Sequence, residues 1–167
     1  VMGCQSIAVV FINAYANATN EIMALEAVRD VWPNSHVIAS HEILPEIREF
    51  ERTSTTALNA YLQPTVGSYL KSLDMALRED DFGGEILIVQ SNGGVMSLDT
   101  ATKRPIRTAL SGPAAGVIAS THIAKEAGFE NIITCDMGGT SFDVSLVAKG
   151  QSSLAAQTSV DFGLIIR

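Results

Sequence analysis

The sequence predicts an α/β protein in which a partly parallel sheet is followed by an antiparallel ribbon. Two observations lead to this fold class. Over the first 128 residues, short apolar runs rich in β-branched residues alternate with segments of helical periodicity, an order typical of parallel strands joined by helices. Beyond that point, apolar and polar residues alternate in short segments separated by turns, as in an antiparallel meander.

The N-terminal strands and helix are predicted from apolar runs and from the turn residues that separate them. Residues 7–12 (IAVVFI) are predicted to form a strand that is buried on both faces. Thr19 or Asn20 is expected to cap a helix that ends at the turn formed by residues 33–35 (PNS). Residues 36–40 (HVIAS) are the next predicted strand.

A long amphipathic helix is predicted next. Pro45 is expected at its first position, Pro64 is expected to interrupt or kink it, and Gly83-Gly84 is expected to end it. Charged residues of both signs alternate near its start and predict an ion-paired helix surface. These residues are Glu42, Glu46, Glu49 and Glu51 with Arg48 and Arg52.

The second half of the chain supplies one more helix and several strands. Residues 86–89 (ILIV) predict a buried strand, and a polar, partly basic stretch covers residues 98–110. A helix with a face of small residues is predicted over residues 113–128. The remaining predicted strands are residues 132–135, 142–147, 152–158 and 162–166, with a turn at Lys149-Gly150. We expect a division into residues 1–128 and 129–167, because the pattern changes between them.

Composition excludes several classes of protein. The chain has 11 Lys and Arg against 18 Asp and Glu, a net charge of -7, which argues against nucleic acid as a partner. No apolar run reaches the roughly 20 residues needed to span a bilayer, and the start lacks the basic residues of a signal peptide. Cys4 and Cys135 are too few for a disulfide framework, so we expect a cytoplasmic protein with two buried thiols.

The strongest chemical signal is the segment ITCDMGGTSFDVSLV, residues 133–147. A predicted strand brings Asp136 to its end, and Gly138 and Gly139 then form a tight turn. Glycines permit a positive φ and close approach of a phosphate, successive amides form an anion-binding nest, and the Thr140 hydroxyl adds a donor. Asp136 beside a phosphate requires Mg²⁺ or an activated water between them. The alternative is an ordinary β-hairpin with Gly-Gly as its turn.

Weaker candidates follow other predicted strands or begin a helix. Asn92 and Gly93 come after a buried strand, where ligands of α/β sheets gather, and the same rule applies to residues 13–17 and to His41-Glu42. Ser111 opens the segment SGPAAG, in which proline in the first turn leaves amides free to hold an anion. Turns and helix packing are the alternative roles. His36, His41 and His122 lack the spacing of metal ligands.

Four segments together resemble the hydantoinase A/5-oxoprolinase family. They are HEILPEIREFERTSTTALNAYLQPTV (41–66), ILIVQSNGGVMS (86–97), RPIRTALSGPAAGV (104–117) and ITCDMGGTSFDVSLV (133–147). Their order along the chain is more specific than any single loop, and the resemblance extends over residues 5–167.

The resemblance implies the fold of the actin-like ATPase superfamily, with two ribonuclease-H-like halves around a nucleotide cleft. Proteins of that superfamily carry two Asp-x-Gly-Gly-Thr-type hairpins. The match here is similar to the second hairpin, and it implies that Asp136 contacts Mg²⁺ or water in catalysis. The implied ATP contacts are Gly138, Gly139, Thr140 and Asp143, with Asn92, Gly93 and Ser111 lining the cleft. The first hairpin is not in this sequence, so the chain resembles an internal piece whose own activity is in doubt.

The family also implies a reaction. An ATP-dependent hydrolase would open a cyclic amide such as a hydantoin or 5-oxoproline by phosphorylating its carbonyl oxygen, using ATP and Mg²⁺. A second subunit, similar to hydantoinase B, or a homo-oligomer is the implied assembly. Two alternatives stay open: the large subunit of an acetone-type ATP-dependent carboxylase, and a structural or interaction module without chemistry of its own.

Overall fold

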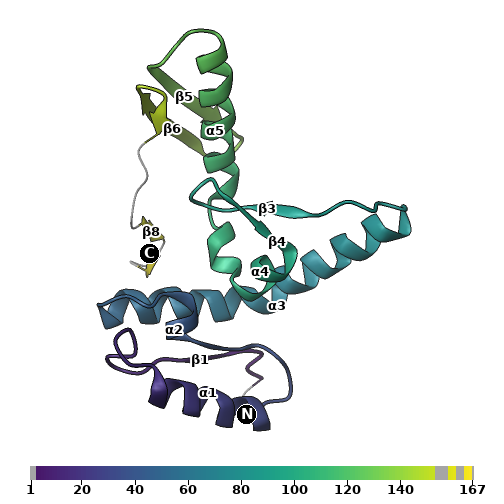
Figure 1. The fold of residues 1–167 in the computed structure, drawn as a ribbon, viewed down its shortest axis with the longest axis vertical. Coiled ribbons are helices and arrows are strands. Elements are labelled where there is room, and N and C mark those ends of the chain that lie inside the picture. Colours follow the sequence, from purple (N-terminus) through teal and green to yellow (C-terminus); the bar gives the residue numbers. More distant parts are fainter. Residues whose placement is uncertain (1–2, 153–157, 161–163, 167) are drawn as a thin grey trace. The chain divides into compact units, whose positions relative to one another are not determined.

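The computed structural model describes residues 3–152, 158–160 and 164–166 (Figure 1). The chain forms two compact units, and neither is continuous in sequence. The first contains residues 1–85, 99–106 and 156–167, and the second contains residues 86–98 and 107–155. The division into residues 1–128 and 129–167 concerns the two ribonuclease-H-like halves and stays a prediction.

The first unit is built on two parallel strands. Strands β1 (Ile7–Val9) and β2 (Val37–Ala39) pair with Ile7 opposite Val37, and helix α1 (Thr19–Val31) connects them. This is the predicted order of strand, helix and parallel strand. One apolar cluster joins the helix to the strands, and it consists of Val9, Leu25, Val37 and Ala39.

Strand β1 is shorter than the predicted residues 7–12, because the next backbone groups bond side chains instead of a strand. The amide of Phe11 donates to Glu21 Oε2 at 2.7 Å. The carbonyl of Phe11 accepts from Arg52 Nη2 at 2.7 Å. With both groups occupied by side chains, the strand ladder cannot continue.

The predicted cap of α1 is wrong. The helix begins at Thr19, so Thr19 and Asn20 lie inside it, and the N-cap residue Ala18 makes no capping bond. Asn17 accepts the amide of Thr19 through Oδ1 at 3.0 Å. A side chain outside the helix therefore satisfies one of its first free amides.

Two further helices follow β2. Helix α2 (Ser40–Ile43) is short, and α3 (Glu49–Glu79) has 31 residues. Pro45 lies between them, so the expectation that it opens the long helix is wrong. Helix α3 runs through Pro64 without interruption and ends before Gly83-Gly84. The helix continues there although proline cannot donate a backbone hydrogen bond.

The predicted ion-paired surface near the start of α3 forms only in part. Arg48 bonds Glu51 at 3.2 Å, whereas Arg52 is fully buried. Arg52 also reaches Glu49 at 3.5 Å, so its charge is not isolated. The buried face of α3 is largely polar here, which apolar periodicity could not indicate.

The polar stretch at residues 98–110 contains two helical segments, α4 (Leu98–Lys103) and the 3-10 helix η1 (Pro105–Thr108). The buried Asn59 of α3 fixes this stretch. Its Nδ2 donates to the carbonyl of Lys103 at 3.1 Å, and its Oδ1 accepts the amide of Ile106 at 3.2 Å. The second apolar cluster lies nearby and contains Ile38, Ile43, Leu44, Ala60 and Ile106.

The second unit begins with a hairpin rather than a buried parallel strand. Strand β3 (Leu87–Val89) pairs antiparallel with β4 (Val95–Ser97), and Leu87 is half exposed. The expectation of a buried strand at residues 86–89 is therefore wrong. Helix α5 (Ser111–Glu126) begins two residues before the predicted position at Pro113 and ends before Gly128.

An antiparallel meander completes the second unit. Strands β5 (Ile132–Met137), β6 (Phe142–Ala148) and β7 (Gln151–Ser152) pair in that order. Lys149 and Gly150 have φ angles of 53° and 69°, which suits a tight hairpin turn. The turn predicted at these residues is confirmed.

In the first unit, β8 (Thr158–Val160) and β9 (Leu164–Ile166) form a separate antiparallel pair. The remainder of the predicted strands at residues 152–158 and 162–166 lies largely outside the described residues. No helix in the described part of the chain combines the length and apolar character needed to cross a membrane. Cys4 and Cys135 are both exposed, so the expectation that these thiols are buried is wrong.

Candidate phosphate-binding site

The β5–β6 hairpin positions the strongest candidate residues. Asp136 lies directly opposite Asp143 in the ladder, and Met137 lies opposite Phe142. The amide of Gly138 donates to the carbonyl of Ser141 at 3.0 Å and closes the bend. The two strands therefore bring both aspartates to the mouth of one tight turn.

The diglycine bend is open to solvent. A Cβ atom added to Gly139 would meet no other atom within 4 Å, and one added to Gly138 would lie 3.9 Å from the carbonyl oxygen of Ser141. Neither glycine has a positive φ, so the bend does not use the left-handed backbone that glycine permits. Their physical advantage is a bare backbone that a ligand can approach closely.

One amide of the bend is bonded internally and two remain available. The Gly138 amide is committed to Ser141. Within the described part of the chain, no hydrogen bond is formed by the amides of Gly139 and Thr140. Both residues are exposed, so their two donors can bind an anion from solvent.

The two faces of the hairpin differ in chemistry. Residues alternate between the faces of a strand, so Thr134 and Asp136 share a face with their partners Ser145 and Asp143. This polar face lines a cavity. The opposite face is apolar, and its exposed side chains are Ile133, Met137, Phe142, Val144 and Leu146.

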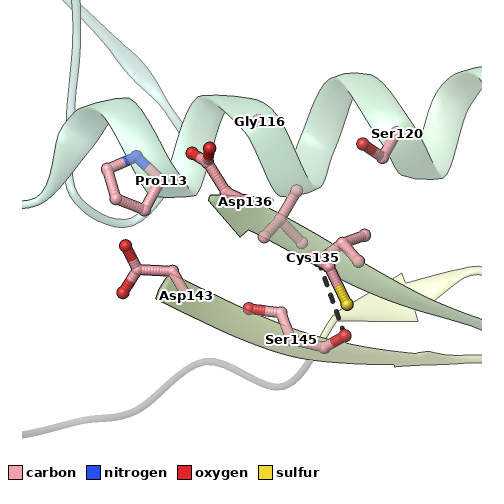
Figure 2. A pocket seen from close by; sticks show the side chains of 9 residues that line it. Pro113, Gly116, Ser120, Cys135, Asp136, Asp143 and Ser145 are labelled. Carbon is pink, nitrogen blue, oxygen red and sulfur yellow. Dashed lines mark hydrogen bonds between the residues drawn. The ribbon is translucent and has the colours of Figure 1, made fainter. Parts of the chain in front are cut away.

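A cavity of about 290 Å³ lies between α5 and the hairpin (Figure 2). Figure 2 shows Asp136 and Asp143 at the Pro113 end of this cavity, with Gly116 and Ser120 farther along α5. Small side chains on α5 leave the space open above the strands. The complete lining is Pro113, Gly116, Val117, Ser120, Thr134, Cys135, Asp136, Asp143 and Ser145.

Two carboxylates and no basic side chain line the cavity. Directly opposed like charges destabilise a strand pair, so a cation between Asp136 and Asp143 would stabilise this arrangement. No cluster of three or more His, Cys, Asp or Glu side chains suited to a metal ion occurs among the described residues. Mg²⁺ commonly uses one or two carboxylates, with phosphate oxygens and waters as its other ligands. The residues present fit an Mg²⁺ that binds together with a phosphate.

Other predicted site residues lie in the same unit but outside the cavity lining. Asn92 and Gly93 form the turn between β3 and β4, where Asn92 Oδ1 accepts the amide of Gly94 at 2.9 Å. Gly93 has a φ of 82°, and a Cβ there would also approach Ile118 Cδ1 of α5, so the tight turn and packing account for this glycine. Ser111 is the first residue of α5. Their role at a nucleotide site stays a prediction.

Sequence reasoning missed most of the α5 side of the cavity. Strand alternation would have placed Thr134 and Ser145 beside the aspartates. Nothing in the local sequence indicates that Gly116 and Ser120 face the hairpin, because that placement depends on how the helix packs.

The structure is similar to a nucleotide-free structure of acetone carboxylase, reported with a mechanism of ATP-dependent acetone carboxylation. The TM-score is 0.79 at 29% sequence identity, over 96% of this chain and 23% of that chain. This similarity confirms the predicted fold class, an α/β fragment of ribonuclease-H-like, actin-like ATPase type.

Residues 52–166 match the model of the hydantoinase/oxoprolinase family, and the chain belongs to this family. The predicted resemblance is thereby confirmed. An uncharacterized protein of Methanocaldococcus jannaschii is 40% identical over 86% of this chain and 21% of its own length. The caprolactamase subunit alpha of Pseudomonas jessenii is 37% identical over 90% of this chain and 22% of its own length. The chain thus spans about a fifth of the length of these relatives.

Proposed function

We propose that this chain is part of an ATP-dependent enzyme that hydrolyses cyclic amides, and that the β5–β6 hairpin binds the phosphates of ATP. The observation that carries the proposal is the bend itself, with two free amides beside two opposed carboxylates at a cavity. Membership of the hydantoinase/oxoprolinase family supports the reaction class. The proposal concerns the full-length, cytoplasmic protein.

The chemistry requires ATP because an unstrained amide is a poor electrophile. Transfer of the γ-phosphoryl group to the carbonyl oxygen would activate the carbonyl carbon toward water. Asp136 and Asp143 would hold Mg²⁺ at the phosphates, and the amides of Gly139 and Thr140 would stabilise charge on phosphoryl oxygens. The Thr140 hydroxyl would add a donor, and Gly138 would keep the bend closed.

A carboxylase subunit is the second candidate function. The similarity to acetone carboxylase favours it, because a ketone or bicarbonate can be activated by the same phosphoryl transfer. The caprolactamase relative is described as a subunit, which supports a partner subunit for either function. A third reading, a module without its own chemistry, would require that the bend bind no nucleotide.

The deciding experiment compares ATP turnover in the full-length protein with cyclic amides and with ketone plus bicarbonate. We expect turnover that depends on a hydantoin, 5-oxoproline or a larger lactam. Asp136→Asn should lower this turnover by about 10²–10³-fold, the loss typical of removing one electrostatic group from a transition state. The matched control is Asp30→Asn, because Asp30 is exposed on α1.

Turnover only with ketone and bicarbonate would favour the carboxylase. Undiminished turnover in the Asp136→Asn variant would remove Asp136 from the mechanism. Failure of full-length wild-type protein to bind Mg-ATP in calorimetry would favour the module without chemistry.

A further inference from the structure

The cavity between α5 and the β5–β6 hairpin extends beyond its phosphate-binding end. Asp136 and Asp143 lie at the Pro113 end, and Gly116 and Ser120 lie farther along α5 (Figure 2). The volume of about 290 Å³ is at the lower end of the range for small-molecule sites. The space therefore suits a ligand the size of one small ring rather than a whole nucleotide.

Hydroxyl groups line the part of the cavity beyond the two carboxylates. Thr134 is opposite Ser145 in the ladder, and this pair shares a face of the hairpin with Asp136 and Asp143. A strand rises about 3.4 Å per residue, so the hydroxyl pair and the carboxylate pair lie about 7 Å apart along the hairpin. Ser120 of α5 adds a third hydroxyl to the lining.

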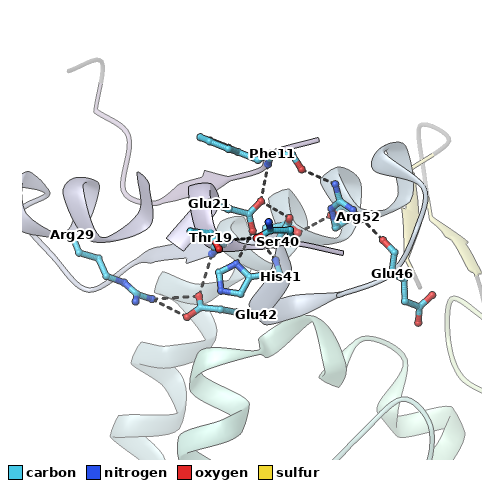
Figure 3. A network of polar contacts seen from close by, with 12 residues as sticks. Phe11, Thr19, Glu21, Arg29, Ser40, His41, Glu42, Glu46 and Arg52 are labelled. Carbon is cyan, nitrogen blue, oxygen red and sulfur yellow. Dashed lines mark hydrogen bonds and ion pairs between the residues drawn. The ribbon is translucent and has the colours of Figure 1, made fainter. Parts of the chain in front are cut away.

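Two of these hydroxyls are unpaired within the described part of the chain. No hydrogen bond is formed there by the hydroxyls of Ser120 and Ser145, whereas Thr134 Oγ1 donates to the carbonyl of Ser145 over a long 3.5 Å. The buried Glu21 of the first unit is the opposite case, because both of its carboxylate oxygens accept bonds from within the protein (Figure 3). A hydroxyl both donates and accepts, so the two unpaired hydroxyls can bind a neutral carbonyl or N–H group of a ligand.

Helix α5 supplies an apolar wall to the same cavity. Pro113 and Val117 line it, and Gly116 lies between them in the sequence. A Cβ added to Gly116 would meet no other atom within 4 Å, so the space beside it is open. Small-molecule sites combine apolar walls with a few polar groups, and the carbons of a small ring can pack against this wall.

The charges of the cavity select against an anionic ring. Of the described side chains that line it, only Asp136 and Asp143 are charged, and none is basic. A carboxylate on the ligand would find no cation among these side chains and would be repelled by both aspartates. An Mg²⁺ at the aspartates would be balanced by phosphate charge, so it would not compensate a further anion.

We propose that this cavity binds the ring that accepts the phosphoryl group, and that it selects neutral cyclic amides over rings that carry a carboxylate. The inference rests on the proposed function for the reaction and goes beyond it by naming the substrate class. Hydantoins and unsubstituted lactams are neutral and belong to this class, whereas 5-oxoproline carries a carboxylate at neutral pH. The hydroxyls of Ser120 and Ser145 bind polar groups of the ring.

The first test uses the full-length protein and two ligands matched in size. 5-Oxoproline and its carboxamide, 5-oxoprolinamide, share one ring and differ in the charge of one substituent. We expect kcat/KM for amide-dependent ATP turnover to be at least tenfold higher for the carboxamide, and hydantoin to behave like the carboxamide. Equal turnover of the matched pair, or a preference for 5-oxoproline, would overturn the proposal and leave the proposed function intact.

The variant Ser120→Leu tests whether the ring enters the cavity, because a leucine at this position of α5 would fill part of the space. We expect KM for 5-oxoprolinamide to rise at least tenfold, with the affinity for a non-hydrolysable ATP analogue and the melting temperature unchanged. The matched control Ser68→Leu makes the same substitution at an exposed position of α3 and should change none of these values. An unchanged KM in Ser120→Leu would overturn the proposal.

The variant Ser120→Cys gives a measurement that does not depend on turnover and changes one atom of the side chain. Iodoacetamide alkylates accessible thiols, and mass spectrometry locates the label. With Mg²⁺ and the ATP analogue present, we expect saturating 5-oxoprolinamide to slow alkylation of the introduced thiol at least threefold. Cys4, an exposed thiol of the first unit, should react at an unchanged rate.

Absence of this protection would overturn the proposal whatever the turnover. If no cyclic amide supports ATP turnover but the introduced thiol is protected, the proposed function fails while binding of a neutral ring in the cavity is supported.

Discussion

Gly139 is the residue at which ligand binding and folding can be separated most cleanly. Its backbone does not need glycine, because its φ is not positive and a Cβ would meet nothing. Gly139→Ala should therefore change the free energy of unfolding by less than about 0.5 kcal/mol. A methyl group on the open side of the bend should still weaken Mg-ATP binding by about tenfold or more, roughly 1.4 kcal/mol.

Calorimetry with Mg-ATP and chemical denaturation of the full-length protein check the two halves of this prediction. Gly83→Ala is the matched control, because a Cβ at Gly83 would also meet nothing within 4 Å and Gly83 belongs to the other unit. Equal affinities of wild type and Gly139→Ala would show that no phosphate approaches this backbone.

At the same scale, the sequence indicated two candidate carboxylates but not how the backbone presents the bend beside them. Asp136 and Asp143 could be paired in advance, since a short turn and strict alternation put them opposite each other. The burial of Glu21 and Arg52 could not be foreseen, because ionisable side chains are normally exposed and their partners here are backbone groups of distant segments.

Among the elements, those with strong periodicity were predicted well. Helix α1, the body of α3 and the β5–β6 hairpin all follow apolar spacing. Strand β1 ends earlier than predicted because side chains from other segments satisfy the backbone, as Glu21 and Arg52 do at Phe11. Helix α4 and η1 were missed because a distant asparagine, Asn59, holds them in place.

The β5–β6 hairpin carries a prediction of its own. Its apolar face exposes cross-strand pairs such as Ile133 with Leu146, at 66% and 65% exposure, and contiguous apolar patches of this kind promote association. The double variant Val144→Thr, Leu146→Thr should reduce self-association of the 167-residue chain in light scattering, while threonine retains strand propensity. Val31→Thr removes an even more exposed apolar side chain outside the hairpin and should have little effect. Equal scattering of the double variant and wild type would contradict this prediction.

At the scale of the whole molecule, acid should loosen the first unit through Glu21. The folded-state pKa of Glu21 lies below its ordinary value, because hydrogen bonds to the charged form outweigh burial. Its stabilising contribution is therefore complete above the unfolded-state pKa, and it is lost as the pH falls through the folded-state pKa. The bond from the amide of Asn13 also lowers the pKa of Glu49, so the two groups act in the same direction.

We expect the denaturation midpoint to fall between about pH 6 and pH 3. Glu21→Gln should be less stable than wild type near neutral pH, because an amide NH₂ would face the donors now bonded to the carboxylate, and its midpoint should depend less steeply on pH. If the denaturation midpoints of wild type and Glu21→Gln changed equally with pH, Glu21 would not couple folding to protonation.

The chain passes between its two units at four places, after residues 85, 98, 106 and 155. No single cut in the polypeptide can release either unit intact, because each is assembled from separated stretches. Limited proteolysis at one junction would leave fragments that depend on each other to complete a unit. A truncation designed at any one of these junctions would remove part of a folding unit rather than isolate a domain.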